Sequence, residues 1–224
     1  MSIQDIINKA ENITITRSKI SGSTISRGGR LRSALVAGNQ PYIMSVAYAP
    51  YQSYTDNRGM IEELNRIDLI HSEDIDIGST NPNLSWLVDY QGDLSSAQIG
   101  QLKLKGTYGG NTIDIETEDL TGAAATDIMF KKGDYITFDG GYRYPYTVTA
   151  DITVGVVAAG FFVSVPLSRP IIVQSGYTFD DTKGILVGPD VTWTVKMTSK
   201  PSFTVIPGRY IQVDGEFVFM EVIG

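Results

Sequence analysis

Hydrophobic and polar residues alternate with a period of two along several short stretches of the chain, as they do in strands that are buried on one face. Isoleucines and threonines alternate between Asn12 and Ile20, and apolar or aromatic residues return on every second position from Tyr42 to Tyr48. The segment Trp86–Tyr90 repeats this pattern, and the short runs Leu102–Leu104 and Ile113–Ile115 flank a glycine-rich turn. All five stretches are predicted to be strands.

In one stretch, apolar residues recur at a spacing near 3.6 residues, which predicts a long helix. Asp56 has the short polar side chain that suits a helix N-cap, and the residues after it place apolar side chains on one helix face. The apolar positions of this face are Met60, Ile61, Leu64, Ile67 and Ile70. The face is expected to pack on a sheet.

Two stretches follow neither period. Residues 21–33 hold three glycines, three arginines and five serines or threonines, and this composition predicts a loop or an extended arm. Residues 75–83 are polar and rich in turn-forming residues.

Near the end of the chain, two apolar runs between Tyr210 and Val222 are separated at Asp214-Gly215, which predicts a closing hairpin.

The pattern of apolar runs and glycines in the sequence changes after residue 127. Short apolar runs follow one another closely between 128 and 187 and are separated by glycines, which is typical of a small barrel or sandwich. From 188 onward the longer strand pattern resumes. We therefore predict a main β domain formed by residues 1–127 and 188–224, interrupted by an inserted β lobe of residues 128–187.

Composition supports a mainly β fold and narrows the range of functions. Twelve tyrosines and eight phenylalanines, with many Val, Ile and Thr, favour strands. The absence of cysteine excludes disulfides and thiolate ligands, and no apolar run reaches the roughly 20 residues that span a bilayer. A net charge of −7 argues against a protein that neutralises many DNA phosphates.

The chain offers few candidates for chemistry. Its one histidine, His71, has no cysteine or second histidine with which to form a metal site, and it is interpreted as a surface residue. Glu73, Asp74 and Asp76 have a loose likeness to a calcium loop, but apolar residues occupy other ligand positions. No catalytic residue, metal site or cofactor site is predicted. A platform for sugar rings is the weaker interpretation of the aromatic residues Tyr42, Tyr48, Tyr51, Tyr54 and Trp86, against core and interface roles.

The most informative polar feature is the group Arg27, Arg30 and Arg32 in the glycine-containing arm. In an acidic chain, the nearest carboxylates for these guanidinium groups are those of a neighbouring copy, and the stretch Glu73, Asp74 and Asp76 is a candidate partner. The alternative is a solvated loop.

Several segments resemble the tail-tube initiator, or tube-to-baseplate junction, proteins of contractile-tailed bacteriophages. They are Ile13–Arg17, Ile25–Arg32, Asp56–Glu62, Lys132–Tyr135, Tyr144–Thr147, Trp193–Val195, Pro201 and Gly215–Phe217. The resemblance covers most of the chain.

The resemblance implies a tail-tube-like β-barrel or sandwich with one packing helix, and a ring of copies, six by expectation, in the tail of a virion assembled in the host cytoplasm. The tail tube protein and the baseplate hub proteins would be its partners. DNA would pass through the ring without specific binding, along a wall for which Asp89, Asp114 and Glu116 are candidates. The alternatives are a carbohydrate- or receptor-binding β module of a tail or cell surface, and an enzyme whose site has no recognised motif.

Overall fold

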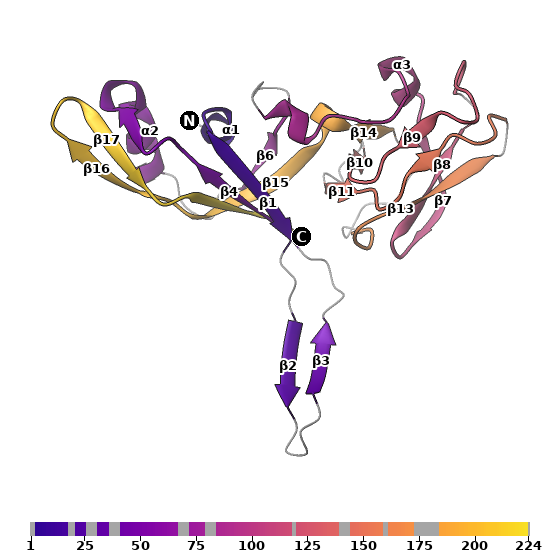
Figure 1. The fold of residues 1–224 in the computed structure, drawn as a ribbon, viewed down its shortest axis with the longest axis horizontal. Coiled ribbons are helices and arrows are strands. Elements are labelled where there is room, and N and C mark those ends of the chain that lie inside the picture. The colour runs from indigo at the N-terminus through magenta and orange to yellow at the C-terminus, as the bar shows by residue number, and fades with distance from the viewer. Residues whose placement is uncertain are drawn as a thin grey trace. The chain divides into compact units, whose positions relative to one another are not determined.

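The computed structural model describes residues 3–17, 21–25, 31–35, 41–66, 72–78, 84–117, 120–138, 144–158, 161–172 and 184–223. It shows a mainly β protein, as the sequence predicts, built from several antiparallel sheets (Figure 1). None of the sheets formed by these residues closes into a barrel. The chain divides into two compact units, Met1–Ser72 with Val195–Ile223, and Glu73–Thr194.

The borders of these units differ from those expected for an insert of residues 128–187. Strand β8 (Thr112–Glu116) precedes that range, yet it pairs along its whole length with β13 (Phe162–Pro166), which lies inside it. Because the antiparallel ladder joins the two segments, the second unit includes residues well before 128. The first unit is discontinuous, since the chain leaves it after Ser72 and returns at Val195.

Besides the pairing of residues 21–25 with 31–35, the described residues of the first unit form two sheets, in which β4 (Tyr42–Ala47), β17 (Tyr210–Asp214) and β18 (Phe217–Glu221) alternate buried and more exposed positions. In one, the order is β1 (Asn12–Arg17), β4, β18 and β15 (Thr192–Ser199). In the other, it is β16 (Ser202–Ile206), β17 and β5 (Tyr51–Ser53). The expected strands at 12–20 and 42–48 are thereby confirmed over Asn12–Arg17 and Tyr42–Ala47, and residues 18–20 lie outside the described residues.

Phe217 joins these two sheets. Its side chain is fully buried, and its ring centroid lies 6.4 Å from that of Phe203 on β16 and 5.2 Å from that of Tyr48, just after β4. The expected closing hairpin is wrong, because β17 and β18 belong to different sheets. The chain crosses between them at Gly215, whose φ of 101° favours glycine.

Two helices are described in the first unit. Helix α1 (Ile3–Asn8) buries Ile3, Ile6 and Ile7, and the hydroxyl of Tyr48 donates a hydrogen bond of 2.7 Å to the carbonyl oxygen of Ile6. Burial raises the pKa of Tyr48, and the nearby Asp5 adds to the shift. The hydroxyl therefore stays protonated and keeps this bond over the ordinary pH range.

Helix α2 (Tyr54–Arg66) confirms the long helix that the sequence predicts, whereas the expected face positions Ile67 and Ile70 lie outside the described residues. Met60 and Leu64 are buried, and the ammonium group of Lys200 donates to the carbonyl oxygen of Leu64 at 3.2 Å. The expected Asp56 cap is wrong. Ser53 precedes the helix, and its side-chain oxygen accepts a hydrogen bond from the backbone N–H of Asp56.

The second unit is assembled from short ladders. One sheet has the order β13, β8 and β7 (Lys103–Gly109), which confirms the strands expected around the turn at residues 108–111. Gly110 has a φ of 71° in this turn. The others are β11 (Tyr146–Thr147), β10 (Tyr135–Phe138) and β14 (Ile185–Val187), and the pair β12 (Ile152–Thr153) and β9 (Ile128–Phe130). Helix α3 (Ser96–Ile99) and the 3-10 turn Gly188–Asp190 also belong to this unit.

The strand expected at Trp86–Tyr90 is not formed. A 3-10 helix (Ser85–Leu87) takes its place, with Trp86 exposed and Val88 buried. The hydroxyl of Tyr90 donates to the carbonyl oxygen of Met129, and burial raises the pKa of Tyr90 to about 12. This side chain ties the segment to β9 by a side-chain bond, which a periodicity argument does not foresee.

Asp134 is a buried carboxyl group that organises the turn before β10. Its Oδ2 accepts from the backbone N–H of Lys131 at 2.8 Å, and its Oδ1 accepts from the backbone N–H of Gln91 at 3.1 Å. Only 3% of the residue is exposed. Burial raises the pKa of Asp134, while these two hydrogen bonds partly oppose the shift.

The Asp134→Asn variant is expected to lower the free energy of unfolding by about 1–3 kcal/mol at acidic pH, because both oxygens of the protonated carboxyl group can still accept a hydrogen bond, whereas the amide nitrogen that replaces one of them cannot. The pKa of Asp134 is higher in the folded than in the unfolded protein, so the protonated carboxyl group contributes to the stability of the fold. This stability is fully present below the unfolded pKa, near 4, and is lost as pH rises through the folded pKa. The difference between wild type and variant should therefore narrow from pH 4 to pH 7 in urea unfolding. A difference that widens with pH would contradict the assignment.

Candidate functional site

The expected arm contains a β-hairpin. Strands β2 (Ser21–Ile25) and β3 (Leu31–Leu35) pair in antiparallel register, with Ser23 opposite Ser33 and Ile25 opposite Leu31. Of the two expected alternatives, a loop or an extended arm, the extended arm agrees with the structure over these residues. Among the described strands, β2 and β3 pair only with each other (Figure 1). An isolated two-stranded hairpin is marginally stable in water, so this arm has a physical need for a partner.

The three arginines of the arm are placed to different extents. Arg32 lies on β3 with Thr24 as its backbone partner, whereas Arg27 and Arg30 lie outside the described residues. His71 lies outside them too. The contact of the arginines with another copy stays a prediction.

The acidic candidates lie on a strand, although the sequence predicts a turn-rich segment from residue 75. Glu73, Asp74 and Asp76 belong to β6 (Ser72–Asp76), which follows β15 in the sheet order. Asp74 accepts a hydrogen bond of 2.6 Å from the hydroxyl of Thr194. Ile75, which lies between Asp74 and Asp76 in the strand, is buried. Among described residues no group of three or more acidic or histidine side chains is arranged to hold a metal ion.

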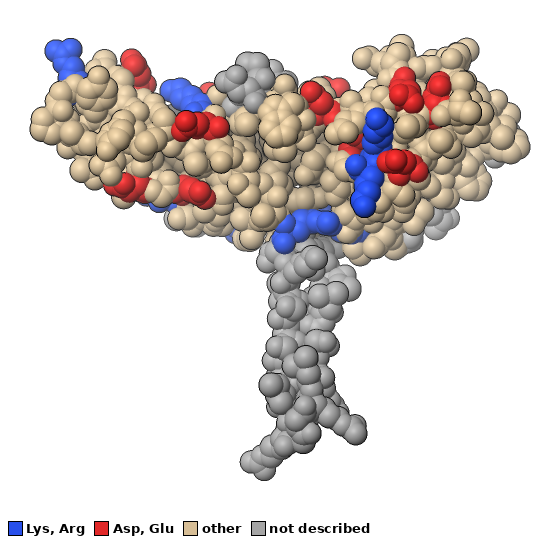
Figure 2. Space-filling view, viewed as in Figure 1, with Lys and Arg blue, Asp and Glu red and all other residues tan. Residues whose placement is uncertain are grey.

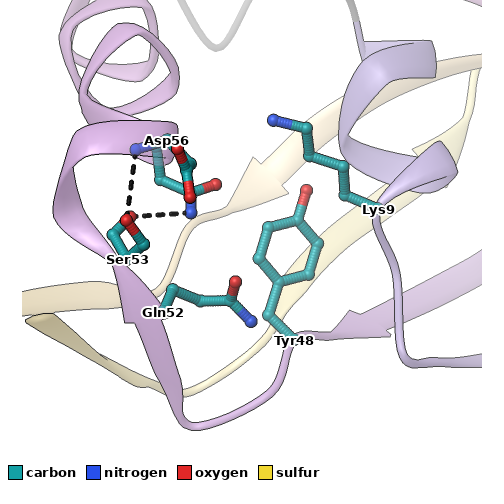
Figure 3. A pocket seen from close by; sticks show the side chains of 6 residues that line it. Lys9, Tyr48, Gln52, Ser53 and Asp56 are labelled. Carbon is teal, nitrogen blue, oxygen red and sulfur yellow. Dashed lines mark hydrogen bonds between the residues drawn. The ribbon is translucent and has the colours of Figure 1, made fainter.

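A pocket of about 370 Å³ opens at the start of α2. Figure 3 shows Lys9 reaching across it from the turn after α1, Tyr48 rising beside it, and Asp56 on the opposite wall. Its lining residues are Lys9, Tyr48, Gln52, Ser53, Asp56 and Asn57. The Asn57 side chain donates to the carbonyl oxygen of Ser53 at 3.0 Å, which fixes the first turn of the helix.

The pocket combines one cation and one carboxylate without a nucleophile and base in contact. The Ser53 oxygen accepts from the Asp56 backbone, and the Tyr48 hydroxyl is engaged by Ile6. The Tyr48 hydroxyl thus donates to a backbone carbonyl, and the Ser53 oxygen binds the start of helix α2. The arrangement is suited to holding a polar group.

A second pocket, of about 260 Å³, lies at the end of β18. Glu221 is buried in its wall and accepts a hydrogen bond of 3.0 Å from the backbone N–H of Tyr42. Lys196 lines the same pocket. The buried carboxylate has a structural role, because it holds the first residue of β4 against β18.

The proposed acidic wall is divided by local pairings. The ammonium group of Lys105 lies 2.6 Å from a carboxylate oxygen of Glu116, and the hydroxyl of Ser164 donates to Asp114. Asp89 is exposed. On the face in Figure 2, acidic and basic side chains are scattered among each other, and neither sign gathers into a continuous patch.

The structure separates the tyrosines that sequence reasoning grouped as a sugar platform. Tyr42 and Tyr48 are buried, whereas Tyr51 is 62% exposed. Tyr51 lies opposite Gln212 in the sheet, on the same face as Tyr210, which is 53% exposed. Sequence reasoning did not single out Tyr210, although its alternation with the buried Ile211 is the signal that places it outside.

No protein-family model and no curated protein sequence matches the chain. No helix in the described ranges is long and apolar enough to cross a membrane.

Replacing Ser53 with Ala is expected to lower the free energy of unfolding by about 0.5–1 kcal/mol, because the N-cap acceptor for the Asp56 N–H is lost. Ser53→Asp should restore most of this stability. Thr55 is the second residue of α2 and is exposed. Thr55→Ala is therefore the matched control, and it should not destabilise the protein. Equal losses for Ser53→Ala and Thr55→Ala in urea unfolding would rule out the cap.

Proposed function

We propose that this chain is a structural subunit of a bacteriophage tail. Copies of it form a ring that joins the tail tube to the baseplate hub and lines the path of the DNA. The observation that carries the proposal is the β2–β3 hairpin, which pairs with no other described strand. It lies in the same segment whose sequence resembles the arm of tube-to-baseplate junction proteins.

The open sheets of the first unit support assembly. Strands β1 and β16 each have one described neighbour, so backbone N–H and C=O groups along their other edges are free of any described strand. Such edges promote association unless they are blocked. A ring satisfies them because each copy offers its edges to the next, and a heterologous contact of this kind closes when the rotation permits.

The charge of the chain fits a conduit that does not bind DNA. A net charge of −7 repels phosphates, and the repulsion is screened over about 10 Å at 0.1 M salt. Glu116 pairs with Lys105, and because their opposite charges offset each other, this pair contributes little to the repulsion of phosphates. The net charge of the ring, rather than a row of free carboxylates, is the basis of this part of the proposal.

A carbohydrate- or receptor-binding module is the second candidate. Exposed Tyr51 and Tyr210 share one face of neighbouring strands, and exposed aromatic side chains can stack on sugar rings. Binding of glycans by a dispersed monomer, lost in Tyr51→Ala and Tyr210→Ala, would favour it over the tail subunit.

The purified chain is expected to form rings or stacked rings, seen by electron microscopy and as a fast boundary in sedimentation velocity. Replacing Arg27, Arg30 and Arg32 together with Ala should shift the boundary towards the monomer at physiological salt. The reason is the loss of guanidinium contacts with a neighbouring copy.

Thermal unfolding of the triple variant should match that of wild type, because the arm forms no ladder with the main sheets. The matched control replaces Lys131 and Lys132 of the second unit with Ala and should leave assembly unchanged. A wild-type chain that stays monomeric would overturn the proposal, and an unchanged boundary in the arginine variant would remove the arm from it.

In a gel-shift titration at low salt, the assembled protein is expected to leave duplex DNA unretained, with a Kd weaker than about 10⁻⁴ M, the weak end of non-specific binding. The physical reason is like-charge repulsion. Retention of the duplex at micromolar protein would contradict the proposed conduit.

A further inference from the structure

Strand β16 presents a sheet edge that no described strand covers. It pairs with β17 on one side only, and Figure 1 shows it at the outer edge of its sheet. Exposed edges in soluble proteins usually carry a charge, a proline or a bulge that prevents further pairing. Residues Ser202–Ile206 contain no charge and no proline, and their register with β17 is regular. Pro201 and Pro207 bound this edge on both sides.

Val205 shows that the apolar layer is incomplete at this edge. It lies opposite Ile211 and therefore on the same face of the sheet, the face that packs on the core. Ile211 is fully buried, yet Val205 is 67% exposed. An added strand would extend the hydrogen-bonded ladder and cover this side chain.

We propose that this edge receives the β2–β3 hairpin of a second copy of the chain. Each hairpin strand has five residues, as β16 has, so one strand matches the length of the edge between its two prolines. The hairpin completes the three-stranded sheet to five strands and gains the partner that an isolated hairpin requires. The inference rests on the proposed function in one respect, that the partner is another copy.

Other edges fit the hairpin less well. On β13, the carbonyl oxygen of Pro166 already accepts a hydrogen bond of 3.0 Å from the N–H of Thr149. Strand β1 exposes polar residues and ends in Arg17, whose guanidinium lies over the ring of Tyr42. Of these three described edges, that of β16 has an exposed aliphatic side chain, whereas the aliphatic side chains of β1 and β13 are buried or half-buried.

The absence of cysteine permits a direct test by disulfide trapping. Thr204→Cys in the middle of β16 is mixed with a separately purified Ser23→Cys or Ser33→Cys variant of the hairpin. Directly opposed residues of paired strands lie within the Cα separation that a disulfide needs. Heterodimers should form on the order of tenfold or more faster than with Thr112→Cys, an exposed control on β8, because docked thiols have a higher effective concentration.

A second variant tests the edge by assembly. Val205→Lys places a charge on β16 and should abolish the fast sedimentation boundary, while its exposure in the monomer lets the variant fold. Val156→Lys is the matched control, since Val156 is 55% exposed in the second unit, and it should assemble as wild type does.

The outcomes separate this inference from the proposed function. Rings without trapping, together with normal assembly of Val205→Lys, would overturn the hairpin contact and leave the tail subunit intact. Trapping in a protein that forms no rings would support the contact and remove the ring. Equal trapping with Thr204→Cys and Thr112→Cys would show random collision and overturn the contact.

Discussion

The first unit depends on the burial of Phe217 between its two sheets. The side chain belongs to β18, but its ring contacts Phe203 of the other sheet and Tyr48 beyond the end of β4. Full burial of such a side chain contributes about 1.5–3 kcal/mol, and the ring contacts add to it. The position of the ring requires the chain to change sheets just before it, and Gly215 permits this with a positive φ. The same crossing leaves β17 to pair with β16 and β5, and so determines which strands lie at the edges.

Those edges are the basis of the proposed assembly. A sheet that closes into a barrel has no free edge, whereas the sheets described here remain open. The hairpin β2–β3 complements these open edges, because its two strands pair with each other and with no other described strand. The pockets carry less of the functional argument. At the start of α2 the polar groups mainly hold the helix, and at the end of β18 the buried Glu221 holds β4.

Local periodicity predicted the mainly β class, the strands near 12 and 42, and the long helix, because each of these is set by neighbouring residues that face one core. It failed where tertiary contacts decide the structure. Trp86, Val88 and Tyr90 alternate like a strand, but the Tyr90 hydroxyl binds the carbonyl of Met129 and Trp86 remains exposed. Asp214-Gly215 looks like a hairpin turn, and only the burial of Phe217 reveals a crossing. The arginine arm was found from composition, whereas the edge of β16 requires knowledge of strand order, which no local pattern contains.

The discontinuity of the first unit also orders events on the ribosome. Strand β4 pairs with β1, made shortly before it, and with β18, made after the whole second unit. Domains generally fold as units during synthesis, and pairings between distant segments form late. Residues 73–194 form a continuous segment and can fold while the N-terminal strands wait for β15 to β18. A polypeptide that terminates prematurely therefore lacks the strands that complete the two sheets of the first unit, so defective translation products are excluded from any assembly that requires both sheets.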